Sequence, residues 1–523
     1  MSAAQDRIGK HGPAARIHAL AAPFDRPLTS YYLLIGTTGL LLALGLVMVL
    51  STSSATQLYA HQPEYSVFAK QLLGMAVGLP MMWLLSKAPP RLFRVTAYPL
   101  MIASLIGLVL VLAIGQTVAG ATRWISVAGL QFQPSEFAKL AFLLWGADLL
   151  ARKEKLGQLT DWRMLLIPLL PGTAALGLLV MLGDDLGTTF LLLVIFLALL
   201  WVVGTPGRMF AGMLGLLGFA LVMMILVASY GRGRITCFLH PAAQAAGSCW
   251  QPIQGKYAIG SGSLFGVGLG DGTEKWGWVP NASTDFIFAI LGEELGLIGT
   301  SCVVLLYGGL AYAGLRIARR MTNPFMRLAA GGATAWIVTQ AVVNIGAVVG
   351  LLPITGVPLP LISAGLSSLL ATMAAVGMLL SFARREPGAA QALAARGPGL
   401  ARRAACVIGL GSWPGRERAA GARTVARPGR AGERIASGSG RTGGSAGQRA
   451  TDRSGPAGRA ARPRSAAGPG QAAGRVPRGQ AAGTPGQPRA PAPSRLAAPG
   501  DHRRAMPGGG AVGPRPGGGS RPR

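Results

Sequence analysis

Long apolar stretches separated by short polar connections dominate the first 386 residues of this chain. Each stretch holds about 20 residues, which is enough for a helix to cross roughly 30 Å of hydrocarbon. Ten spans are predicted, at 31–51, 67–86, 95–115, 135–151, 164–182, 186–203, 207–229, 286–315, 326–351 and 358–382. The pattern therefore predicts an all-α polytopic membrane protein with about ten transmembrane helices. It excludes a soluble domain, and no cleavable leader is expected before the first span.

The segment 386–523 has a different composition, in which Gly, Ala, Pro, Ser and Arg dominate. It is strongly basic, with 24 basic and 4 acidic residues from position 387 onward, so it carries most of the net charge of +30. Such a segment buries too little apolar surface to fold, so a disordered tail is expected. Its arginines favour contact with anionic membrane lipids. Binding of nucleic acid is not favoured, because Trp413 is its only aromatic residue.

Basic residues concentrate in every second connection, as in the clusters around Arg91, Arg152 and Arg319. The short connections between those clusters are poor in basic residues: 52–66 and 352–357 hold none, and 116–134 holds only Arg123. The positive-inside rule then places both termini in the cytoplasm, including the N-terminal segment 1–30. The long loop 230–285 is expected to face the outside of the membrane.

Two of the four cysteines, Cys237 and Cys249, lie in that loop, where a disulfide persists if it forms. A disulfide and two free thiols remain equally open from the sequence. Cys302 lies in a predicted span and Cys406 in the tail, and their spacing indicates no metal site.

Asp285 is a single carboxylate where the long loop meets the start of an apolar run. An ionisable group at a membrane edge is costly to keep there, so it is a candidate functional residue. The structural alternative is a helix N-cap supplied by Ser283, Thr284 or Asp285, which is a common arrangement before an apolar stretch.

Further polar groups lie close to predicted spans. Glu136 and Lys139 share one face of a helix that starts at Pro134, either as a self-neutralising buried pair or as part of a site. Arg123, next to Trp124, is either an interfacial anchor or a cation for an anionic ligand. Asp184 and Asp185 fit a tight turn, or a site that binds a divalent ion or orients a cation.

Two later segments are rich in glycine or proline. The stretch 251–270 contains Lys256 and five of its glycines between 260 and 270, which permit close approach of backbone or ligand. The segment from Asn344 to Ser368 holds Pro353, Pro358 and Pro360 together with Ser363. This composition is typical of a broken helix that lines a cavity.

Taken in order, these blocks resemble the SEDS family (shape, elongation, division and sporulation), polytopic bacterial proteins that include FtsW and RodA. The matching blocks cover residues 31–385: Gly120-Ala-Thr-Arg-Trp-Ile125, Gln133-Pro-Ser-Glu-Phe-Ala-Lys139, Asp185-Leu-Gly-Thr188, Thr284-Asp-Phe-Ile-Phe-Ala-Ile290, Gly292-Glu-Glu-Leu-Gly296 and Asn344 through Ser368. Local sequence such as Lys275-Trp276 resembles FtsW of high-GC Gram-positive bacteria more than RodA. Departures include Pro280-Asn281-Ala282-Ser283, where the family commonly has Pro-Glu-x-His.

The resemblance implies a peptidoglycan glycosyltransferase that polymerises lipid II, with Asp285 as the catalytic carboxylate. It also implies substrate-binding positions, which are Arg123, Glu136, Lys139, Asp185, Lys256, Asn344 and Ser363. The chemistry asks for one general base and for positive charge at the departing pyrophosphate. That charge comes from basic side chains or from a divalent cation such as Mg²⁺ or Mn²⁺. No other cofactor is expected.

The resemblance further implies a class B penicillin-binding protein transpeptidase and other divisome proteins as partners, in the plasma membrane at the division septum. Other functions remain open from the residues. A transporter that flips lipid II also needs many helices with Gly/Pro-broken segments and buried charges. A non-catalytic scaffold needs only binding surfaces, and an elongation polymerase of the RodA type needs the same site.

Overall fold

The computed structural model describes residues 28–392 apart from gaps at 60, 119–120, 128, 158–161, 228, 241–246, 248 and 390. All described residues belong to one compact unit, Met1–Arg427. The predicted cytoplasmic N-terminal segment lies outside the described residues except for its last three positions. The predicted disordered tail lies outside them from residue 393 onward.

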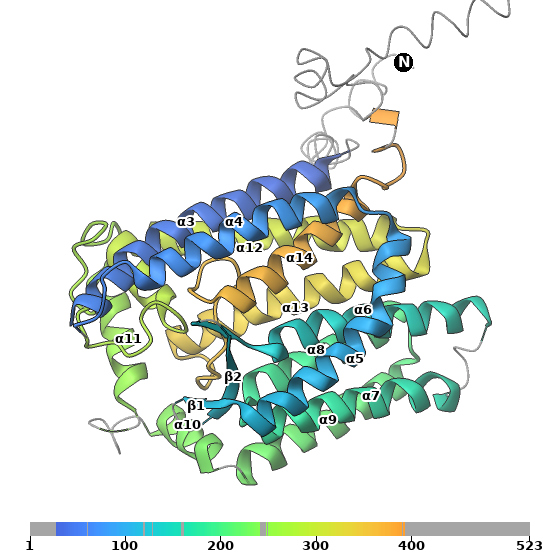
Figure 1. Ribbon diagram of the computed structural model, residues 1–523, viewed down its shortest axis with the longest axis horizontal. Helices are drawn as coiled ribbons and strands as arrows, with labels where there is room; N and C mark the ends of the chain where they lie inside the picture. The colour runs from blue at the N-terminus through green and yellow to red at the C-terminus, as the bar shows by residue number, and fades with distance from the viewer. Residues whose placement is uncertain are drawn as a thin grey trace, which may run out of the picture. The chain divides into compact units, whose positions relative to one another are not determined.

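Ten long helices match the ten predicted spans (Figure 1). They are α3 (Thr29–Tyr59), α4 (Ser66–Lys87), α5 (Pro90–Ile114), α6 (Pro134–Lys155), α7 (Trp162–Leu182), α8 (Leu186–Val203), α9 (Gly207–Val227), α12 (Ile287–Arg320), α13 (Pro324–Val349) and α14 (Leu366–Ala383). Proline at the first helical turn favours the start of α5, α6 and α13. The polytopic all-α architecture is therefore confirmed.

Seven of the described helices are long and apolar enough to cross a membrane by length and composition: α3, α4, α5, α8, α12, α13 and α14. The other three long helices, α6, α7 and α9, are not long and apolar enough by the same measure, for reasons visible in the sequence. Helix α6 carries charged residues at both ends, while the apolar parts of α7 and α9 are shorter, Leu169–Leu182 and Gly207–Ala220. Helix α14 is the most buried of the seven and α4 the least. The protein is a multi-pass membrane protein.

The helices pack as an interleaved bundle rather than in chain order. Helix α14 packs most extensively on α4, α12 on both α13 and α3, and α8 on α13 and α6. Figure 1 shows α3, α4, α12 and α14 side by side in its upper half, although they come from opposite ends of the described chain. The buried side chains of these helices form one continuous hydrophobic core.

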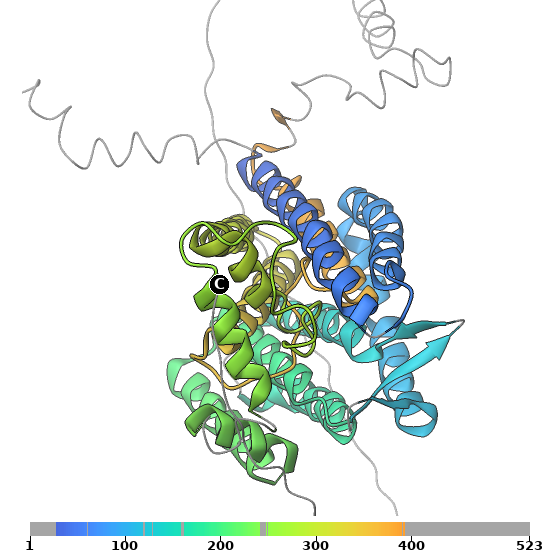
Figure 2. The same cartoon turned by 90° about the vertical axis from the view of Figure 1, so that its left-hand side faces the viewer.

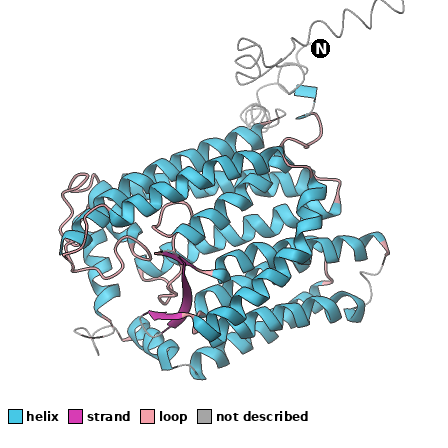
Figure 3. Ribbon diagram, viewed as in Figure 1, coloured by secondary structure: helices cyan, strands magenta, loops and turns pink. Residues whose placement is uncertain are grey.

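A small sheet interrupts the helical chain between α5 and α6, where the sequence predicted only a loop. Strands β1 (Gln116–Val118), β2 (Ala121–Val127) and β3 (Leu130–Phe132) pair antiparallel in the order β1-β2-β3. The pairs Thr117–Thr122 and Ile125–Phe132 are in register. Branched and aromatic residues favour a strand, and Gly129 adopts the positive φ of a tight turn. The sheet lies beside the end of α5 (Figures 2 and 3).

The long loop between α9 and α12 is also partly helical. It contains α10 (Ser229–Leu239) and α11 (Trp250–Ser261), joined by a disulfide between Cys237 and Cys249. The disulfide alternative is therefore the one that the structure adopts, whereas Cys302 is a free, exposed thiol. Helix α11 packs on α12 and α13. The glycine-rich residues that follow it lie directly against α12, where Gly296 breaks the helical geometry with a φ of 65°.

The segment between α13 and α14, residues 350–365, is not helical, so the predicted span at 358–382 begins too early. Its prolines remove backbone donors and oppose a helix. Inside a membrane protein, side chains must satisfy the exposed carbonyls of such backbone. Here Gln340 donates to the Pro358 carbonyl at 2.9 Å, and Tyr307 donates to that of Pro360. We call residues 350–365 the re-entrant segment.

Candidate active site

A cavity of about 340 Å³ opens where the sheet, the loop before α12 and the re-entrant segment meet. We call this end of the helical bundle the Asp285 end. The charged residues that line the cavity come from five different parts of the chain: Arg123 from β2, Glu136 from α6, Asp185 before α8, Arg234 from α10 and Asp285 before α12. Its volume falls within the range of small-molecule sites, roughly 300–1,000 Å³. Tertiary structure thus collects charged groups that are far apart in sequence.

The backbone around Asp285 is held by α13 and by the re-entrant segment. The Asn344 side-chain amide donates to the Asp285 carbonyl and to the Val357 carbonyl, each at 2.8 Å. The Ser363 hydroxyl donates to the Thr284 carbonyl at 2.6 Å. Asn344 and Ser363, predicted to bind substrate, therefore lie behind the catalytic candidate and not among the cavity-lining residues.

Asp285 does not act as the N-cap that the sequence left open. The residue at the cap position of α12 is Phe286, and no side chain makes a capping hydrogen bond there. The carboxylate instead faces the cavity and is half-buried. Burial raises the pKa of Asp285 to about 6, against the opposing effects of Arg234 and Arg123 and with a smaller contribution from Asp185. This carboxyl group changes protonation close to neutral pH, as a general base requires.

Arg123 lies between two acidic residues of the α7–α8 turn. It donates to the Asp184 carbonyl, and its Nη1 lies 3.8 Å from Asp185 Oδ1. Asp184 has a positive φ, which confirms the tight turn predicted for this pair. Asp185 in turn caps α8 through the Thr188 amide at 3.1 Å and the Thr188 hydroxyl at 2.8 Å. One aspartate therefore both starts a helix and orients a cavity arginine.

Glu136 and Lys139 form an ion pair at 2.9 Å inside the helical bundle. The Lys139 ammonium also donates to Gln340 Oε1 at 3.2 Å and lies 5.2 Å from the centroid of the Trp336 ring. Lys139 is fully buried and is not among the cavity-lining residues, whereas Glu136 is. The self-neutralising pair predicted from the sequence is thus present, and only its acidic member faces the cavity.

Lys256, the remaining predicted binding residue, lies elsewhere. It lines a separate small cavity with Cys237, Ala347 and Gly350. It is not among the residues that line the Asp285 cavity. The reason is the α11 helix, which the sequence analysis did not predict and which places Lys256 beside the C-terminal end of α13.

Arg234 is the principal site residue that the sequence analysis missed. It lines the cavity, and its Nη1 donates to the Ile354 carbonyl of the re-entrant segment at 3.0 Å. The available signal was the pair Arg232 and Arg234 close together in a long loop predicted to be external. Gln133, Gln251 and Trp124 also line the cavity.

The described residues do not provide a ready divalent-cation site. No group of three or more His, Cys, Asp or Glu side chains within residues 28–392, outside the gaps, could hold a metal ion. Of the three cavity acids, Glu136 is paired with Lys139, and Asp185 is hydrogen-bonded to Thr188 and near Arg123. We therefore assign the positive charge of the site to arginine and derive no step through a metal.

Comparison with known proteins identifies the family. Residues 31–387 match the FtsW/RodA/SpoVE family model, described as "cell cycle protein". The chain belongs to this family. The resemblance to the SEDS family is thereby confirmed, and the match coincides with the predicted ten-helix region rather than with the tail.

Individual members of the FtsW/RodA/SpoVE family agree with this assignment. The probable peptidoglycan glycosyltransferase FtsW of Mycobacterium tuberculosis is 41% identical over 372 residues, covering 71% of each chain. Stage V sporulation protein E of Bacillus subtilis is 38% identical over 356 residues, covering 67% of this chain and 96% of that protein.

Solved structures give the same result. A chain from a peptidoglycan synthase complex, solved to describe the coordination of polymerization and crosslinking, matches with 29% identity and a TM-score of 0.54, covering 67% of this chain and 97% of its own. Thermus thermophilus RodA matches with 30% identity and a TM-score of 0.50, covering 68% of this chain and 96% of its own.

Proposed function

We propose that this protein is a peptidoglycan glycosyltransferase that polymerises lipid II into glycan strands for septal wall synthesis. The observation that carries the proposal is Asp285, a carboxylate with a pKa of about 6 that faces a cavity containing two arginines. Membership of the FtsW/RodA/SpoVE family and 41% identity to an FtsW named as a probable glycosyltransferase support it.

The reaction needs a base for the acceptor and positive charge for the leaving group. Asp285 accepts the proton of the GlcNAc 4-hydroxyl as that oxygen attacks C1 of the donor MurNAc. The bond between C1 and the pyrophosphate oxygen breaks, its electron pair leaves with the lipid pyrophosphate, and the anomeric carbon inverts. A positioned general base contributes typically 10²–10⁴-fold.

The arginines serve the other half of the reaction. Pyrophosphate leaves without protonation, so a second carboxylic acid is unnecessary, unlike in glycosidases. Arg123, held by the Asp184–Asp185 turn, supplies fixed positive charge at the cavity wall. Such preorganised charge stabilises a developing anion more than mobile water does.

The same proposal includes the protein's setting. The Asp285 end is proposed to face the outside of the cytoplasmic membrane, where glycan strands are made, with both termini inside; the distribution of basic residues supports this orientation. A class B penicillin-binding protein is the proposed partner, because polymerised strands require crosslinking. A similar chain belongs to a peptidoglycan synthase complex that coordinates polymerization and crosslinking, which supports this assignment.

The test is polymerisation of labelled lipid II by the purified full-length protein in detergent. We expect glycan polymer from the wild type and none from Asp285→Asn, with both proteins giving the same gel-filtration profile. Polymer from Asp285→Asn at the wild-type rate would show that the base is misassigned. Headgroup translocation in vesicles without polymer would support the transporter, and neither activity would support a scaffold.

A further inference from the structure

We propose that Arg234 is a positioning residue for Asp285, held in place by the Cys237–Cys249 disulfide. The proposal rests on the proposed function, because it concerns how the base of that reaction is oriented and kept ionised. The sequence analysis assigned no role to Arg234 and left the disulfide open.

The geometry of Arg234 connects three parts of the site. Its Nη1 donates to the Ile354 carbonyl at 3.0 Å, so the guanidinium is anchored to the re-entrant segment. A methyl carbon placed on Gly356 would lie 3.2 Å from Arg234 Nη2 and 3.6 Å from Asp285 Oδ2. The guanidinium and the carboxylate therefore face the same small space beside Gly356.

The disulfide explains why a short external helix presents its arginine at this point. Cys237 follows Arg234 by three residues, so the two lie on the same face of α10. Among the described elements, α10 packs mainly on α9, and the disulfide is its covalent link to α11. Cys249 is fully buried at the start of α11.

Helix α11 is in turn fixed to the chain that leads to Asp285. Gln251 Nε2 donates to the Pro280 carbonyl at 3.0 Å, and Trp250 Nε1 donates to the Trp278 carbonyl at 2.8 Å. The backbone of α11 at Gly255 lies against the Phe286 ring, next to Asp285. The disulfide thus couples Arg234 to the loop that carries its target carboxylate.

The charge of Arg234 gives its proximity to Asp285 a measurable consequence. The ionisable groups around Asp285 are Arg123 from β2, Asp185 before α8, Glu136 from α6 and Arg234 from α10, and Lys139 neutralises Glu136. Arg234 is the strongest of the effects that lower the pKa of Asp285. Without its positive charge the pKa of Asp285 rises further, so a higher pH is needed to ionise the base.

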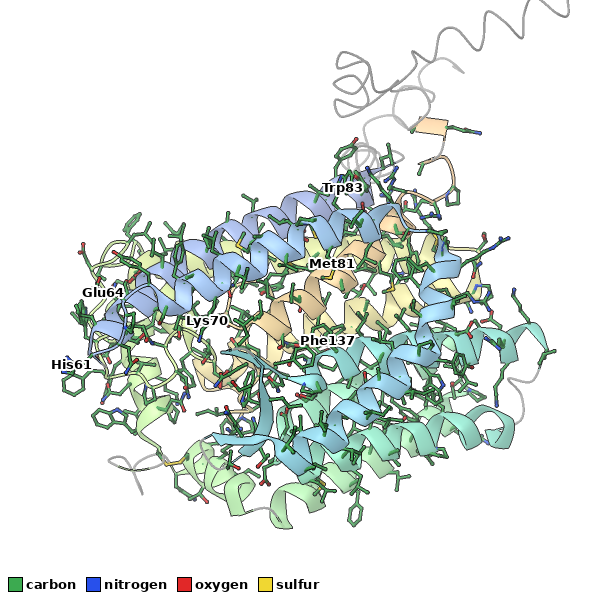
Figure 4. The ribbon with its side chains drawn as sticks, in the orientation of Figure 1. His61, Glu64, Lys70, Met81, Trp83 and Phe137 are labelled. Atoms are coloured by element: carbon green, nitrogen blue, oxygen red, sulfur yellow. A yellow bond between two sulfur atoms is a disulfide. The ribbon has the colours of Figure 1, made fainter. Side chains whose placement is uncertain are left out.

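The experiment compares pH profiles of kcat/KM for lipid II polymerisation by the full-length protein, between about pH 5 and 9. We expect Arg234→Gln to shift the acidic limb of the kcat/KM profile to higher pH by about one unit. At pH values below the Asp285 pKa of both proteins, kcat/KM of the variant should be about tenfold lower than that of the wild type, and the difference should be smaller at about pH 8. Arg234→Lys keeps the charge and should leave the limb near the wild-type position. Lys70→Gln removes an exposed charge from α4 near the same end (Figure 4) and should leave the profile unchanged.

The disulfide is tested with the double variant Cys237→Ser plus Cys249→Ser. We expect it to shift the acidic limb in the same direction as Arg234→Gln and to add little when combined with Arg234→Gln, because both act through one contact. A double variant with a wild-type profile would overturn the role given to the disulfide.

Two further outcomes separate this proposal from the proposed function. If Arg234→Gln loses activity equally at every pH while Arg234→Lys retains it, Arg234 binds substrate and does not position the base. If the wild type forms no polymer, the proposed function itself fails, whereas polymer from Asp285→Asn at the wild-type rate means that the base is misassigned. If Asp285→Asn is inactive but Arg234→Gln has the same pH profile as the wild type, only the positioning role of Arg234 is refuted.

Discussion

At the scale of single residues, the catalytic candidate is a group that the fold keeps at some cost. Burial opposes ionisation of Asp285, and two arginines only partly compensate, so its pKa stays near 6 instead of its ordinary 3.8. For an acid with a raised pKa, folding is penalised as pH rises above the unfolded value, and the penalty is complete above the folded value. At neutral pH Asp285 therefore weakens the fold while it is ready to accept a proton.

This argument predicts opposite effects of Asp285→Asn on stability and activity. The amide has a similar shape and no charge to desolvate, so we expect a thermal unfolding temperature equal to or above that of the wild type at pH 7.5. Polymer yield should fall at least about a hundredfold. In the wild type kcat/KM should rise as pH passes about 6. A less stable Asp285→Asn protein would mean that the carboxylate supports the fold instead.

The Glu136–Lys139 pair should instead stabilise the fold, since both side chains are buried and each neutralises the other. Lys139→Met leaves the Glu136 carboxylate buried without its cation, and removing one member of such a pair costs about 3–5 kcal/mol. Adding Glu136→Gln to Lys139→Met should restore much of that stability. Thermal unfolding in detergent checks both variants. A Lys139→Met protein as stable as the wild type would contradict the structural role of the pair.

At the scale of elements, the re-entrant segment organises the cavity. It forms no regular helix, and it is tied to the rest of the protein through Gln340, Asn344 and Arg234. Gly356 lies in this segment with a φ of 70°, at the point where Arg234 and Asp285 approach one another. A side chain at this position would have a strained backbone conformation and would crowd the side chains of Arg234 and Asp285.

Gly356→Ala therefore tests whether activity requires the small space between Gly356, Arg234 and Asp285 to stay free of a side chain. The methyl group would lie within contact distance of both charged groups, so we expect polymerase activity to fall at least tenfold. Gly204→Ala is the matched control, because Gly204 also has a positive φ, of 85°, but nothing within 4 Å. Both variants should lose about 1–2 kcal/mol from the strained backbone. Equal activity in the two would contradict a role for the crowding at Gly356.

At the scale of the whole molecule, the fold separates the site from the basic cluster on the opposite end of the bundle. The Asp285 end also carries the connection between α3 and α4, where His61 and Glu64 lie (Figure 4). The other end carries the connections after α4 and α6, with Lys87, Arg152 and Lys153. The proposed orientation follows from this asymmetry of charge.

Cysteine labelling tests that orientation directly. In a protein whose Cys302 and Cys406 are changed to serine, we expect Glu64→Cys to react with a membrane-impermeant maleimide in intact spheroplasts. Leu156→Cys, exposed after α6, should react only after lysis. The reverse pattern would place Asp285 in the cytoplasm and exclude its role in external glycan synthesis.

Much of the architecture could be predicted from hydrophobic length alone, because a bilayer requires about 20 apolar residues per span. The errors fall where local pattern is weak. Strands β1–β3 are short, α10 and α11 lie in a loop with little periodicity, and the re-entrant segment is apolar enough to resemble part of a span. That Lys256 lies away from the Asp285 cavity could not be predicted for the same reason, since its position depends on α11.

The sequence by itself determined the spans, their order, the family and a single carboxylate at a membrane edge, because these follow from composition and from local blocks of residues. Only the tertiary structure decided that Arg123, Arg234 and Asp285 share a cavity, that Lys139 is sealed inside the bundle, and that Cys237 and Cys249 are joined. The physical reason is that burial and charge–charge interaction depend on the distances in space between segments, and spacing along the sequence does not give those distances.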